Sequence, residues 1–99
     1  MELALLEEAM RSSDPVRRRG AIDRAPNHPA AERVLIAALG DPAGEVRRAA
    51  VRALARRGGI TASRAIATVS GRDPSPAVRA EAVTALAAIL RRDRPEPRS

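Results

Sequence analysis

The chain has 99 residues, a formal net charge of +6 and neither cysteine nor aromatic residues, and all 18 of its Lys and Arg positions are arginine. This composition excludes disulfide bonds and thiolate metal sites, and no apolar run approaches the ~20 residues that span a membrane. Because the N-terminus also lacks the basic start of a signal peptide, we expect one small cytoplasmic domain with a thin core.

Apolar residues recur with helical spacing along most of the chain and predict six amphipathic helices. The expected helices cover residues 2–11, 15–25, 30–39, 42–57, 62–70 and about 74–92. Asp41 and Pro42 are typical of a helix N-cap followed by the first helical position, while Gly58 and Gly59 favour a left-handed stop. Two prolines beyond the last helix predict a disordered tail over residues 93–99.

A repeated pattern organises the middle and the end of the chain. Residues 41–55 and 73–87 agree at 9 of 15 positions when they are aligned at an offset of 32, and a shorter copy begins at Asp14. A period in the thirties is typical of helical repeat arrays, in which each unit buries its apolar face against its neighbours. The sequence therefore predicts an all-α fold, a short α-solenoid of about three helix pairs over residues 1–92.

Arginine recurs at every fourth residue on the outer face of the fourth expected helix, at Arg48, Arg52 and Arg56, and Arg18 extends this stripe on the second. Like charges at this spacing slightly oppose helix formation, which favours a use as a binding surface. An acidic protein surface is the preferred partner, and nucleic-acid phosphates bound without sequence preference are the alternative. The lack of aromatic residues for base stacking argues against nucleic acid. A third interpretation is that GC-rich codon usage explains the arginines without any partner.

No arrangement typical of an active site accompanies these features. His28 is the only histidine, and its position between Asn27 and Pro29 favours a loop or capping role over a metal or catalytic one. The hydroxyl residues have no base to activate them, and the Gly-Gly pair precedes no phosphate-binding motif. We therefore expect no enzymatic activity and no cofactor, and an accessory fragment of a lyase-like enzyme is the weakest hypothesis.

The order Gly-Asp-Pro, then Val-Arg, then spaced Ala and Leu, as it stands in residues 40–54, resembles the HEAT repeat. The resemblance is closest to the short HEAT-like type of phycobilisome lyases and bacterial scaffold proteins. It implies a protein-binding surface along the second helices. It also implies a ladder in which the aspartate and the arginine after valine bond within and between repeats. The implied ladder pairs are Asp41 with Arg47, Asp73 with Arg79, and Asp14 with Arg17.

The last expected helix carries apolar residues on a flank that a further repeat could cover. Val83 matches Val51 of the preceding repeat, and Leu90 falls on the same side about two turns later. Capping repeats usually turn a polar face outward, so this flank predicts a homodimer or partner contact through Val83 and Leu90. The alternative is that both side chains turn inward and pack on the fifth helix.

Overall fold

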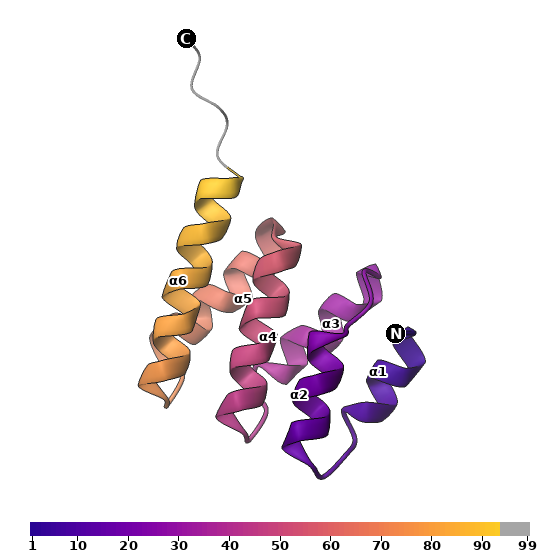
Figure 1. Ribbon diagram of the computed structural model, residues 1–99. Coiled ribbons are helices and arrows are strands. Elements are labelled where there is room, and N and C mark those ends of the chain that lie inside the picture. The colour runs from indigo at the N-terminus through magenta and orange to yellow at the C-terminus, as the bar shows by residue number, and fades with distance from the viewer. Residues whose placement is uncertain (94–99) are drawn as a thin grey trace.

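The computed structural model describes residues 1–93, which form six α-helices and no strand. The helices are α1 (Leu3–Ala9), α2 (Pro15–Asp23), α3 (Pro29–Ala38), α4 (Gly44–Arg57), α5 (Gly59–Arg72) and α6 (Pro76–Arg92). Figure 1 shows α2, α4 and α6 side by side in one layer, with α1, α3 and α5 in the other. The predicted all-α solenoid of three helix pairs is confirmed for this part of the chain. The predicted tail lies, apart from Asp93, outside the described residues.

Polar side chains and prolines set the starts of three helices. Asp14, His28 and Ser75 are the N-caps of α2, α3 and α6, and each side chain accepts a hydrogen bond from a backbone N–H in the first turn. In all three helices proline follows the cap, at a position where no backbone donor is needed. The single histidine is therefore a capping residue, whose Nδ1 accepts from the N–H of Ala30 at 3.0 Å.

The start of α4 is later than the sequence predicts. The helix begins at Gly44, and Ala43 is its N-cap residue without a side-chain hydrogen bond. Asp41 does not cap the helix itself, because its Oδ1 accepts from the N–H of Ala43 in the preceding turn at 2.9 Å. The aspartate thus shapes the turn into α4 and leaves the rest of its carboxylate for another contact.

The junction between α4 and α5 depends on two glycines. Gly58 and Gly59 have φ angles of 69° and 87°, in the left-handed region that favours glycine. They let α5 begin directly at Gly59, earlier than expected. A Cβ at Gly58 would lie 2.6 Å from Nη2 of Arg92, so the end of that side chain, which donates to the carbonyl of Ala55 at 2.7 Å, would have to shift. This hydrogen bond links the end of α6 to the last turn of α4.

The core is a thin layer of aliphatic side chains between the two helix layers. Val46, Ala50 and Leu54 of α4 are completely buried, and Val78 and Ala82 of α6 belong to the same cluster. The small alanines let the helix axes approach closely, so the branched side chains can interlock. Every helix keeps an exposed side, and none in the described part of the chain is long and apolar enough to cross a membrane.

Candidate interaction surfaces

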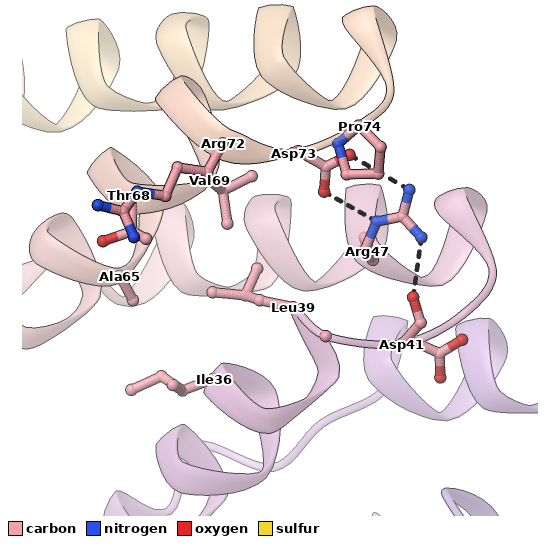
Figure 2. A pocket seen from close by; sticks show the side chains of 11 residues that line it. Ile36, Leu39, Asp41, Arg47, Ala65, Thr68, Val69, Arg72, Asp73 and Pro74 are labelled. Carbon is pink, nitrogen blue, oxygen red and sulfur yellow. Dashed lines mark hydrogen bonds and ion pairs between the residues drawn. The ribbon is translucent and has the colours of Figure 1, made fainter.

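Two arginines link successive repeats through shielded ion pairs. Arg18 of α2 donates from Nε and Nη2 to the two carboxylate oxygens of Asp41, at 2.8 and 3.0 Å. Arg47 of α4 donates in the same way to Asp73, at 2.8 and 3.2 Å, as Figure 2 shows. The aspartate side chains are only 7% and 3% exposed. Bidentate pairs of this kind fix the relative position of the elements that carry them.

Each arginine at this position also donates from Nη1 to the carbonyl of the residue six positions earlier. These contacts are Arg18 to Ser12, Arg47 to Asp41 and Arg79 to Asp73, at 2.7–2.8 Å. In Arg18 and Arg47, one guanidinium therefore closes the turn of its own repeat and holds the aspartate of the next. We call this set of contacts the ladder.

The ladder corrects the pairing that the family resemblance implies. Asp41 meets Arg47, and Asp73 meets Arg79, but only at the backbone carbonyl of the aspartate. The carboxylate of Asp41 binds the arginine of the preceding repeat, Arg18, instead. The physical reason is that each carboxylate also accepts from the backbone N–H two residues later, which turns it away from its own helix.

The expected pairing of Asp14 with Arg17 is wrong. The carboxylate of Asp14 is occupied as the N-cap of α2, and Arg17 is exposed. Arg18 holds the ladder position. Ser12 takes the place that aspartate has in the later repeats. Its Oγ accepts from the N–H of Asp14 at 3.1 Å, just as the carboxylate of Asp41 accepts from the N–H of Ala43. The first repeat thus closes its turn with a neutral side chain.

The ladder carboxylates are held in their ionised form. Burial by itself raises the pKa of Asp41, but the hydrogen bond from Arg18 and the backbone N–H outweigh it, so the pKa lies below its ordinary value. The pKa of Asp73 is lowered for the same reasons, with Arg47 as the side-chain donor. These groups are charged at neutral pH and are occupied by their donors, so their role is to hold the repeats together.

The arginine stripe, defined as Arg48, Arg52 and Arg56, is exposed along α4. Arg48 and Arg52 both reach Oε1 of Glu81 on α6, from Nη2 at 3.4 Å and from Nε at 3.0 Å. Arg56 lies on a separate hollow of about 260 Å³ that Asn27 also lines. Arg18 does not extend the stripe, because it is buried and bound in the ladder. The expected surface is therefore shorter than the sequence suggested and is partly neutralised by one carboxylate.

A cleft of about 560 Å³ opens between α3 and α5, next to the ladder (Figure 2). Ile36, Leu39, Ala65 and Val69 form its apolar walls, and Arg72 lies on its rim. Sequence reasoning missed it because helical periodicity places Leu39, Ala65 and Val69 on inward faces. The pattern carries no sign that α3 and α5 diverge and leave part of those faces open.

The outer flank of α6 is exposed, as a partner contact through Val83 and Leu90 requires. Val83 is 57% and Leu90 is 66% exposed, so neither turns inward to pack on α5. Val51, which holds the position of Val83 in the preceding repeat, is completely buried. In Figure 1, α6 stands at the edge of its layer, with α4 on one side only.

Comparison with protein families and with known proteins gives one finding. Residues 2–87 match the family model described as HEAT repeats. No curated protein and no solved structure matches the chain. The matched segment runs from the residue before α1 into α6 and so includes a part of every helix pair.

Proposed function

Because the chain belongs to the HEAT-repeat family, we propose that it is a non-enzymatic protein-interaction module that binds an acidic surface of another protein. Repeat arrays of this kind present an extended surface along one helix layer, which suits recognition of a partner more than chemistry on a small substrate. Because of the residue pattern in 40–54, we also propose that its repeats are of the short HEAT-like type that phycobilisome lyases and bacterial scaffold proteins carry.

The observation that carries the proposal is the way two stripe arginines bind one carboxylate. Arg48 and Arg52 converge on the same oxygen of Glu81, and their side chains remain 44% and 49% exposed. Guanidinium groups have five donors in a fixed fork, so one shared carboxylate oxygen leaves most of these donors free. The stripe is thus already arranged to bind carboxylates, with capacity for those of a partner.

Nucleic acid is the less favoured partner. Glu81 places a negative charge within the stripe, which weakens its attraction for a continuous row of phosphates. The sequence also has no aromatic side chain to stack on an unpaired base. Recognition of separate carboxylates on a protein surface fits both features better.

The test compares two triple variants with the same loss of charge. In the first, Arg48, Arg52 and Arg56 are changed to Gln, and binding to poly-L-glutamate at low salt should fall strongly. In the matched control, three exposed arginines away from the stripe are changed to Gln. The control positions are Arg11, Arg33 and Arg64.

The control variant should keep most of the binding, because its surface charge falls by the same amount while the stripe is intact. An equal loss in both variants would show that only net charge matters and would contradict the proposal. Binding to duplex DNA that falls steeply with salt and disappears in the stripe variant would assign the surface to nucleic acid instead. Pull-downs with and without nuclease then separate these partner classes in the native cell.

A further inference from the structure

Among the described residues, the ladder position that Arg79 would bind is unfilled. Arg79 donates from Nη1 to the carbonyl of Asp73 at 2.7 Å, as the two earlier ladder arginines do in their own repeats. Those two arginines use Nε and Nη2 to bind the aspartate of the next repeat. Within residues 1–93, no carboxylate occupies the corresponding place beside Arg79. Its guanidinium is thus positioned by one contact and has two donors available.

The apolar surface beside Arg79 shows the same lack of a neighbour. Ile22 of α2 and Val51 of α4 are completely buried in the core cluster, and α2 packs on α4 as α4 packs on α6. Val83 occupies their position on α6 and is 57% exposed, with Leu90 exposed on the same flank. The array therefore ends, within the described residues, on a surface whose two internal counterparts are both covered by another repeat.

The N-terminal end is built differently and does not fit this surface. Ser12 replaces the ladder aspartate there, so it offers a hydroxyl group where Arg79 requires a carboxylate. Arg17 replaces the valine that packs between repeats, Val46 in α4 and Val78 in α6, and it is exposed. A second copy stacked head to tail would thus bring a hydroxyl group instead of a carboxylate to Arg79 and a guanidinium instead of a valine to the joint, which charge and packing both oppose.

We infer that the C-terminal face, defined as Arg79, Val83 and Leu90, binds a helical repeat of a different polypeptide. The partner presents an aspartate just before the first turn of a helix, and its carboxylate accepts from Nε and Nη2 of Arg79. Its packing face carries small and branched apolar residues, like those of α6 that lie against α4. The internal joints between α2 and α4 and between α4 and α6 supply the template for both features.

The test uses a copy of the full chain as the probe. Ser12→Asp and Arg17→Val give the N-terminal end of the probe the aspartate and the valine of an internal repeat. Val83→Glu and Leu90→Glu close the C-terminal face of the probe, so it cannot associate with itself. Both changed positions on α6 are exposed, so the helix should remain folded, which circular dichroism checks.

Wild-type chain mixed with this probe should form a one-to-one complex in sedimentation, while each protein alone stays a monomer. Arg79→Gln in the wild-type partner should weaken the complex about tenfold to a hundredfold, the usual loss for a charge-assisted hydrogen bond. Ile60→Glu, which removes an exposed apolar residue on α5, is the matched control and should leave the affinity unchanged.

Two results would overturn the inference. One is the absence of a complex at high concentration between folded proteins. The other is a wild-type homodimer that Val83→Glu with Leu90→Glu dissociates, because that result would assign the face to a second copy packed through α6.

Discussion

Arg47 and Arg48 are neighbours on α4, and both reach a carboxylate at the joint with α6, but their surroundings differ. The Arg47 side chain is 12% exposed and binds Asp73 at 2.8 Å, whereas Arg48 is 44% exposed and reaches Glu81 at 3.4 Å. Breaking a buried pair leaves a charge without compensation, while an exposed pair is screened by water and salt. The comparison teaches that burial separates the arginines that hold the array from those that remain available to partners.

The largest expected effect comes from removing the buried member of this comparison. Arg47→Ala leaves the shielded carboxylate of Asp73 without its bidentate partner, and we expect a loss of about 1–3 kcal/mol in unfolding free energy. Arg52→Ala on the exposed side should change it by no more than about 0.5 kcal/mol. Urea unfolding followed by circular dichroism measures both. Similar midpoints for the two variants would show that the ladder does not hold the repeats together.

The pH dependence of stability should come from the same buried side. Because the pKa values of Asp41 and Asp73 are lowered in the folded chain, their contribution is complete above the ordinary carboxylate pKa of about 3.9 and is lost as the pH falls from there through the lowered pKa of the folded chain. Unfolding free energies measured from neutral to acidic pH should therefore decline in wild type. With Asp41→Asn and Asp73→Asn combined, this decline should shrink. An unchanged acid dependence would mean that other carboxylates control acid unfolding.

The smallest effect on stability is expected for Glu81, the partner of the exposed arginines, and its substitution tests binding most directly. Glu81→Gln should change the unfolding free energy by less than about 1 kcal/mol, and added salt should remove even that difference. The same substitution frees Arg48 and Arg52, so affinity for poly-L-glutamate should rise. A fall in affinity would show that Glu81 arranges the stripe for binding instead of competing with the partner.

The helices and their order follow from the sequence because helical periodicity and proline positions are local signals. The ladder aspartates of the second and third repeats could also be predicted from the sequence, because Asp41 and Asp73 occupy the same position in the repeated pattern. Their partners could not, since the choice between the two neighbouring arginines depends on the direction in which a turn points the carboxylate. That direction is a property of the packed array.

Sequence comparison assigns the wrong register to the first repeat, because its residues Asp14 and Pro15 resemble Asp41 and Pro42 of the second. Asp14 with its following proline looks like Asp41, but it is a helix cap, and the residue that matches Asp41 in space is Ser12. A serine that replaces an aspartate has no sequence signature, so Arg18 was assigned to the exposed stripe instead of to the ladder. Only the repeated contact to the carbonyl six residues earlier reveals the correct register.

The cleft beside the ladder has a mechanical consequence. α4 and α6 pack along their lengths, while α3 and α5 touch little and leave the open space that Figure 2 shows. Closing or widening that space displaces solvent and leaves the packed side chains of the other layer in place, so it costs less than shearing the core. The easiest deformation is therefore a change in curvature, measured by the width of the cleft that Arg47 and Asp73 line at one end. A three-repeat array of this design therefore bends more easily than its helices slide past one another.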